Sequence, residues 1–295
     1  MDLYNIFNQI LVIFLVLIVG YAAKKVNAVS DSFCSGLVQF ITNISLPAMI
    51  ISSMNYDFSP QMLLMSGKLL IICIIAYIIS IIAAYIMPKV FRIKEQKKGV
   101  FQFMIIFANI GYMGIPVINA VYGSQGVFYA AIYNMPFNLL IWTLGVILLQ
   151  KKGKNSGISF KKLINPGTVS VLIGFAIFIF SIKLPVPIAA TINMVGSVTT
   201  PLSMFYIGAM LAGEKLGRLF SDPATYEMSF VRLILLPLIV LLVMRPFVSD
   251  KLLLGVPVIL TAMPAAANTA IMAGLYDADI YTASQGVFIS TMLSV

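Results

Sequence analysis

Apolar residues run through this chain in long blocks that short polar stretches separate. A helix needs about 20 mostly apolar residues to cross the hydrocarbon core of a bilayer. The pattern therefore predicts an all-α polytopic membrane protein. We expect ten transmembrane helices, at about residues 4–23, 33–54, 62–88, 100–121, 125–149, 166–183, 188–212, 227–247, 252–274 and 280–295. The last block is short for a span, so we expect the given chain to stop inside its final helix.

The composition narrows the class of protein further. Sixty percent of the 295 residues are hydrophobic and only 10% are charged, which is more apolar surface than a soluble domain could bury. No loop is long enough for a soluble catalytic or ATPase domain, and no Walker-type phosphate loop is present. The chain has no histidine, so histidine-based metal sites and catalytic triads are impossible. We expect neither an enzyme nor a cofactor, and no metal site.

Basic residues are distributed unevenly between the loops, and this sets the predicted topology. The loops on one side hold Lys183, Arg245 and Lys251. The alternate loops hold fourteen cations, namely Lys24, Lys25, Lys89, Arg92, Lys94, Lys97, Lys98, Lys151, Lys152, Lys154, Lys161, Lys162, Lys215 and Arg218. Cytoplasmic loops carry the excess of Lys and Arg. We therefore expect both termini outside the cytoplasmic membrane, and the net charge of +9 reflects topology, not nucleic-acid binding.

The two halves of the chain resemble each other. The string Ser-Gln-Gly-Val-Phe occurs at 124–128 and again at 284–288, and an asparagine precedes each copy, Asn109 by 15 residues and Asn268 by 16. We expect repeats at 1–149 and 166–295, joined by a cytoplasmic linker at 150–165. Each repeat holds five predicted helices, an odd number, so the second copy enters the membrane inverted. Inverted repeats are typical of secondary transporters.

Helix-breaking residues interrupt the fourth and ninth predicted helices at matching places. The fourth contains Ala-Asn-Ile-Gly-Tyr-Met-Gly-Ile-Pro at 108–116, and the ninth contains Met-Pro-Ala-Ala-Ala-Asn-Thr at 263–269. Proline removes a backbone donor and glycine favours non-helical angles. Unwound backbone at membrane depth is tolerated only where protein encloses it or it lines a cavity. We expect the two broken helices to cross near the bilayer centre.

Such a crossing would bring free N–H groups and positive helix ends to one point, which suits a small anion. The asparagine amides can donate as well as accept hydrogen bonds. The expected substrate-binding residues are Asn109, Ile110, Gly111, Tyr112, Ala267, Asn268 and Thr269, and the residues that shape the crossing are Gly114, Pro116 and Pro264. The alternative is a pair of proline kinks that serve only helix packing.

Two cations fall within predicted spans, Lys68 and Arg232, at related positions of the two repeats. Charges inside a membrane are costly and usually functional, so either could attract an anion. The alternative is that each snorkels to the interface. No carboxylate lies in the middle of a span, which leaves few candidates for a proton relay. Gln125 and Gln285 are candidate oxygen ligands for a sodium ion.

Several of these strings are similar to those of the auxin efflux carrier family. The match rests on Asn109 to Pro116, which ends in Met-Gly-Ile-Pro, on Gly20-Tyr21, and on Ile-Ser-Leu-Pro-Ala at 44–48. The chain resembles a bacterial permease of that family and lacks the large hydrophilic central loop of its plant members. It also has Leu64 where plant members carry an aspartate before the lysine at position 68. These departures argue against auxin itself as the substrate.

The resemblance implies a fold related to the bile acid:sodium symporters. Helices 1, 2, 6 and 7 would form a scaffold, and helices 3–5 and 8–10 would form a transport domain that moves as an elevator. It also implies a substrate contact at Asn138, where plant members carry glutamine.

We therefore expect a secondary transporter that exports small organic anions, carboxylates above all. The alternatives are a sodium-coupled importer and a ligand-binding membrane receptor that does not transport. The expected partners are the anion, the lipid bilayer and a second copy of the chain joined through the scaffold.

Overall fold

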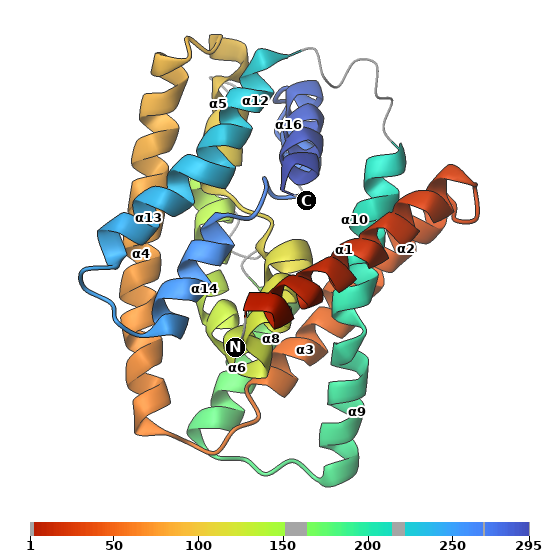
Figure 1. Cartoon of the computed structure of the whole chain (residues 1–295), viewed down its shortest axis with the longest axis vertical. Coiled ribbons are helices and arrows are strands. Elements are labelled where there is room, and N and C mark those ends of the chain that lie inside the picture. The colour runs from red at the N-terminus through yellow and green to blue at the C-terminus, as the bar shows by residue number, and fades with distance from the viewer. Residues whose placement is uncertain (1–2, 151–163, 214–221, 268, 295) are drawn as a thin grey trace. The chain divides into compact units, whose positions relative to one another are not determined.

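The computed structural model describes residues 3–150, 164–213, 222–267 and 269–294. Within these ranges the chain folds into helices, and the one β-type pairing that they contain is an antiparallel bridge between Ala108 and Ala265. Figure 1 shows the course of the chain. The expectation of an all-helical protein is confirmed for the part of the chain that the structure describes.

Several of the helices are long and apolar enough to cross a membrane. Among the described residues there are five, at Asp31–Ser53, Pro60–Val90, Ile110–Leu149, Val186–Ala212 and Pro223–Met244. Shorter apolar helices cover Pro166–Ile179 and Lys251–Thr261. This set of helices is that of a polytopic membrane protein. The ten-helix inverted repeat stays a prediction.

The chain divides into two compact units, and each draws on both halves of the sequence. The first comprises Met1–Gly67, Gly111–Ile132 and Ile164–Glu214, and the second comprises Lys68–Ile110, Tyr133–Leu163 and Lys215–Val295. Three elements have residues in both units, namely α4 (Pro60–Val90), η2 (Ile110–Gly114) and α6 (Ile115–Leu140). The segment Gly111–Ile132 clusters with the first unit. The division into a scaffold and a transport domain stays a prediction.

Small residues allow close helix contacts in the first unit. Helix α1 packs along α10 (Figure 1), and an added Cβ at Gly20 would lie 2.0 Å from the Phe205 carbonyl oxygen. At Gly208 an added Cβ would lie 1.8 Å from the Leu17 oxygen. Small residues let helix backbones approach closely in membrane proteins. The helical elements that lie wholly in this unit are α1 (Leu3–Lys25), α2 (Asp31–Phe40), η1 (Ile41–Ser45), α3 (Leu46–Ser53), α8 (Pro166–Ile179), α9 (Val186–Ser197) and α10 (Thr199–Gly213).

Helix α6 is broken inside its range. Gly123 has φ 62° and ψ −158°, far from helical values, so two helical segments meet there. A positive φ is accessible to glycine at little cost because it has no Cβ. The break lies between the predicted helices at 100–121 and 125–149, so the two segments of α6 correspond to parts of these two predicted helices.

The second unit holds the ninth interrupted helix and the part of the fourth that ends at Ile110. Helix α16 contacts α12, α15 and α5, and α12 and α16 lie near each other at the top of Figure 1. The remaining helical elements of this unit are α5 (Glu95–Ile106), η3 (Ile141–Gly145), α7 (Val146–Leu149), α12 (Pro223–Phe230), η5 (Val231–Leu235), α13 (Leu236–Met244), α14 (Lys251–Thr261), α15 (Thr269–Leu275) and α16 (Ile280–Leu293).

Helix α4 has apolar side chains on all its faces. Ile71, Ile74, Ile78 and Ile82 are each about half exposed, at 49–61%, and they recur every three or four residues along one face. Cys73 and Ala76 on the same helix are fully buried. A helix that is apolar all round is either enclosed by protein or lies in a membrane. The exposed isoleucine stripe of α4 therefore fits contact with lipid.

Candidate functional site

The two broken helices cross within the second unit through a short antiparallel pairing of their unwound backbones. The Asn109 N–H donates to the Pro264 carbonyl at 2.8 Å, and the Ala266 N–H donates to the Phe107 carbonyl at 3.0 Å. The bridge between Ala108 and Ala265 lies between these two bonds. The unwound segments of the fourth and ninth interruptions therefore pair with each other in this unit, whereas a crossing near the bilayer centre stays a prediction.

Local sequence explains why the chain leaves the helix at these places. Helix α5 ends at Ile106, and Phe107 has the extended angles φ −101° and ψ 108°. Helix α14 ends at Thr261, shortly before Pro264, which has no N–H to continue a helix. Each unwound segment thus needs backbone partners that its own helix no longer supplies. The crossing supplies some of them, as unwound backbone at membrane depth requires.

Arg232 supplies further partners to both unwound segments. Its Nε donates to the Met263 carbonyl at 3.0 Å, and an Nη donates to the Ile105 carbonyl at 2.6 Å. The side chain is 1% exposed, so the guanidinium is enclosed by protein. The last carbonyls of a helix carry partial negative charge and favour a cation. Arg232 therefore binds together the C-terminal end of α5 and the segment that follows α14.

The burial of Arg232 corrects one expectation. Snorkelling would carry the guanidinium to water at the membrane surface, whereas here it is bound to backbone carbonyls inside the unit. The snorkelling alternative is wrong for Arg232. A side chain that lies against both broken helices has a direct influence on the shape of the crossing.

Ser290 of α16 holds the same segment from another side. The Ala265 N–H donates to Ser290 Oγ at 3.1 Å, and Ser290 Oγ donates in turn to the Gly286 carbonyl at 2.7 Å. Ser290 is fully buried. Because an unpaired buried N–H is costly, this hydroxyl stabilises the unwound course of the ninth interruption.

The Asn109 side chain lies buried at the crossing, with 3% of the residue exposed. Its Nδ2 has no hydrogen-bond partner among the described residues. Asn268, the predicted counterpart in the second repeat, lies outside the described residues. A buried amide donor of this kind is available to an acceptor atom of a ligand.

Aromatic side chains pack beside the crossing. The ring centroids of Phe103 and Phe107 lie 4.6 Å apart, and those of Phe107 and Phe137 lie 5.7 Å apart. Gly145 makes room for them, because a Cβ there would come within 2.8 Å of the Phe103 ring. The crossing is therefore bordered on one side by apolar rings, which lower the local dielectric and strengthen electrostatic interactions.

The other predicted site residues of this unit lie at or near the interruptions. Ile110 and Pro264 are buried, and Ala267 is half-buried. Thr269 is fully buried, and its hydroxyl donates to the Ala266 carbonyl, as does its N–H. Asn138 is half-buried, and its Nδ2 donates to the Asn134 carbonyl at 3.1 Å. Their contact with a substrate stays a prediction.

Four of the predicted residues belong to the first unit. Gly111 and Tyr112 are half-buried, and Gly114 and Pro116 are buried. The Tyr112 hydroxyl forms a 2.6 Å hydrogen bond with Thr42 Oγ1. This bond fixes the ring of Tyr112, and a substrate role for the hydroxyl would require it to exchange that partner or share it.

The remaining candidates differ in their exposure. Gln125, in the first unit, is exposed, whereas Gln285, in the second, is fully buried. Lys68 is exposed and lines a groove of about 530 Å³ together with Ile71, Ile75 and Phe247. Exposure at the edge of an apolar groove is what snorkelling predicts for Lys68.

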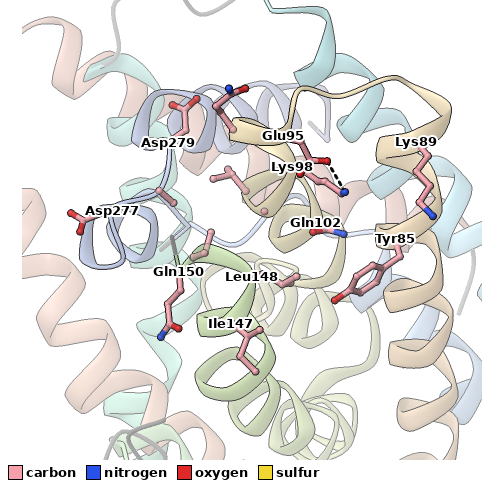
Figure 2. Close-up of a pocket in the computed structure, with 15 residues that line it drawn as sticks. Tyr85, Lys89, Glu95, Lys98, Gln102, Ile147, Leu148, Gln150, Asp277 and Asp279 are labelled. Atoms are coloured by element: carbon pink, nitrogen blue, oxygen red, sulfur yellow. Dashed lines mark hydrogen bonds and ion pairs between the residues drawn. The ribbon is translucent and has the colours of Figure 1, made fainter. Parts of the chain in front are cut away.

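A larger cavity of about 1040 Å³ opens at the end of the second unit where α5 begins. Figure 2 shows the Glu95–Lys98 ion pair, with 2.9 Å between Nζ and Oε1, and the side chains of Tyr85 and Gln102 that line the same cavity. Gln102 is 5% exposed, and its Nε2 has no partner among the described residues. Gln102 lies four positions before Ile106, where α5 ends at the crossing.

The sequence reasoning missed Ser290 as a site residue and gave Arg232 only a general charge role. An arginine in an apolar span was the available signal for Arg232. Ser290 offered none, because a buried serine that bonds a backbone N–H looks like any other serine in a membrane helix.

Comparison with known proteins gives a consistent result. The family model described as "Membrane transport protein" matches residues 5–163 and 157–295. An uncharacterized transporter of Methanocaldococcus jannaschii is 24% identical over 296 residues, with 98% of this chain and 95% of that protein covered. The uncharacterized transporter YfdV of Escherichia coli K12 is 22% identical, with 97% and 93% covered. The mouse lysosomal cholesterol signaling protein is 23% identical, with 100% of this chain and 37% of the mouse protein covered.

Proposed function

The chain belongs to the membrane transport protein family, the family of the auxin efflux carriers, and from this premise we propose that it is a secondary transporter of small organic anions, carboxylates above all. The family consists of transport proteins and not of enzymes. The observation that carries the proposal is the buried crossing at Asn109 and Pro264. It combines a buried amide donor without a partner among the described residues and a nearby fixed cation, Arg232.

An anion is the ligand that these groups favour. Asn109 Nδ2 can donate to a carboxylate oxygen. The positive charge of Arg232 attracts an anion, and none of the predicted site residues is acidic. Because a carboxylate loses its hydration on entry, the site must replace the lost hydrogen bonds. Asn109 Nδ2, which has no partner among the described residues, is the group proposed to supply one of them.

We propose that transport proceeds as an elevator, in which the second unit carries the crossing across the membrane against the first. The proposal includes two inverted five-helix repeats, both chain termini outside, and a homodimer formed through the first unit. The direction follows from physics, because a negative-inside potential drives a net anion outwards. Export therefore needs no coupling ion.

Two other functions remain as competitors. A sodium-coupled importer would need oxygen ligands for the ion, and the buried Gln285 is the better candidate of the two glutamines. A membrane receptor that binds a ligand without moving it is favoured by the similarity to the lysosomal cholesterol signaling protein, whose name describes signalling.

The proposal is tested in proteoliposomes that contain the full chain. Transport currents are recorded for acetate, lactate, benzoate and phenylacetate and for malonate and succinate, each with and without sodium. A sodium-independent current for one of these acids supports the anion exporter. A current that requires sodium favours the importer. Ligand binding without either current or tracer flux favours the receptor.

A further inference from the structure

Among the described residues, Arg232 forms no ion pair with a carboxylate. The structure has ion pairs between described residues at Lys24–Asp31, Lys97–Asp222 and Lys98–Glu95, and none of these three involves Arg232. The partners of its guanidinium are the neutral carbonyls of Ile105, Ile106 and Met263. Carbonyl dipoles stabilise a cation locally, but they leave the net charge of the unit unchanged.

A buried, unpaired charge is costly inside a membrane and is usually tied to function. A neutral donor could take the place of Arg232 if its only task were to bond these carbonyls. The guanidinium bonds the carbonyl of Met263. The next residue, Pro264, accepts the backbone bond from Asn109, so the charge lies beside the backbone of the crossing. A negative substrate bound there would neutralise it.

We propose that Arg232 is the fixed counter-charge of the substrate and makes the site selective for monovalent anions. This inference rests on the proposed transport function and narrows its substrate class. A bound monoanion and Arg232 together have no net charge. With a bound dianion, one negative charge remains, and with a bound neutral amide, the positive charge of Arg232 remains. The monoanion complex is therefore the form that crosses the membrane most easily.

The same argument assigns the voltage-dependent step. The loaded unit crosses without net charge, so the empty unit carries the positive charge of Arg232 when it returns. A potential of 100 mV biases one charge that crosses the whole field by about fiftyfold. A negative-inside potential thus holds the empty site towards the cytoplasm, where it loads the next anion for export.

The test compares wild type, Arg232→Gln and Arg232→Lys with a control variant in proteoliposomes. Arg245→Gln is the matched control, because Arg245 is the C-cap residue that follows α13 and is exposed. Tracer flux is measured for two sets of compounds, each with a monocarboxylate, its neutral amide and a related dicarboxylate. The sets are benzoate, benzamide and phthalate, and acetate, acetamide and malonate. Charge movement after voltage steps is recorded without any substrate.

We expect wild type and Arg245→Gln to prefer the monocarboxylate over its amide and the dicarboxylate by about tenfold or more, and to show substrate-free charge movement. Arg232→Gln should lose both properties, and Arg232→Lys should restore both. A role in holding the backbone alone would lower all fluxes together and leave the acid-to-amide ratio unchanged.

The inference is overturned if folded Arg232→Gln keeps the wild-type acid-to-amide ratio and charge movement while it transports acids; the proposed function would then survive without it. If Arg232→Gln does not fold, the wild-type measurements decide. Equal flux of mono- and dicarboxylates, or no substrate-free charge movement in a protein that transports acids, overturns the inference. Binding of benzoate in preference to benzamide without flux in wild type supports the counter-charge and refutes the transport function.

Discussion

The backbone N–H of Asn109 and the carbonyl of Pro264 are joined by a 2.8 Å hydrogen bond, although 155 positions separate the two residues in the sequence. Each lies where a helix of the second unit is interrupted. The bond leaves the side chain of Asn109 unused by the backbone pairing, and its Nδ2 has no partner among the described residues. The backbone N–H of Asn109 thus stabilises the crossing, whereas its side-chain Nδ2 is available to a ligand.

We predict that Asn109→Ala lowers anion flux by at least about tenfold and leaves the protein folded. The backbone bond to Pro264 does not depend on the side chain, whereas a carboxylate would lose one donor in a dry site. Flux is measured in proteoliposomes, and folding is monitored by size-exclusion chromatography and by the midpoint of thermal unfolding.

Gln96→Ala is the matched control for this variant, because it removes an exposed amide from the same unit. It should transport as wild type does. Wild-type flux in a folded Asn109→Ala protein would refute the assignment of Asn109 to the substrate site.

The positions of the helices could be read from the sequence because the signals are local. Apolar blocks predicted a helix at 62–88, and the structure has one at Pro60–Val90. The gap between the blocks that end at 121 and begin at 125 corresponds to the non-helical Gly123. The grouping of Gly111–Ile132 with the first unit could not be read in this way, since it depends on packing between segments distant in sequence.

The candidate site was predictable to a smaller extent. Glycine and proline marked the two interruptions, because these residues change backbone geometry wherever they occur. The partners of the interrupted backbone were not visible. Arg232 and Ser290 bind carbonyl and N–H groups, which every residue carries, so no sequence pattern identifies which side chain reaches which backbone atom.

Ser290→Ala should destabilise the second unit by about 1–3 kcal/mol, the cost of leaving a buried N–H unpaired. The N–H in question belongs to Ala265 at the crossing. Ser80→Ala is the control, because the buried Ser80 hydroxyl only donates to the Ala76 carbonyl of its own helix. The free energy of unfolding is measured in detergent. Equal effects of the two substitutions would contradict the role given to Ser290.

Gly208→Ala should destabilise the first unit by about 1–3 kcal/mol, the range typical of overpacking. The added Cβ would lie 1.8 Å from the Leu17 carbonyl oxygen, and backbone cannot move aside as a flexible side chain can. Gly36→Ala is the matched control, since a Cβ there meets nothing within 4 Å and alanine favours a helix by about 0.5–1 kcal/mol over glycine. Thermal unfolding should move down for the first variant and up or not at all for the second. Equal stability of the two variants would contradict the close approach of α1 and α10.

The predicted topology can be tested with two single cysteines in a Cys34→Ser background, which removes the half-buried thiol and leaves the buried Cys73. Lys94 and Ser249 are both exposed, and the distribution of basic residues places them on opposite sides of the membrane. A membrane-impermeant maleimide applied to intact cells should label Ser249→Cys and not Lys94→Cys. After the cells are opened, both should be labelled, which shows that each thiol is reactive. Labelling of Lys94→Cys from outside would contradict the predicted orientation, in which both chain termini lie outside.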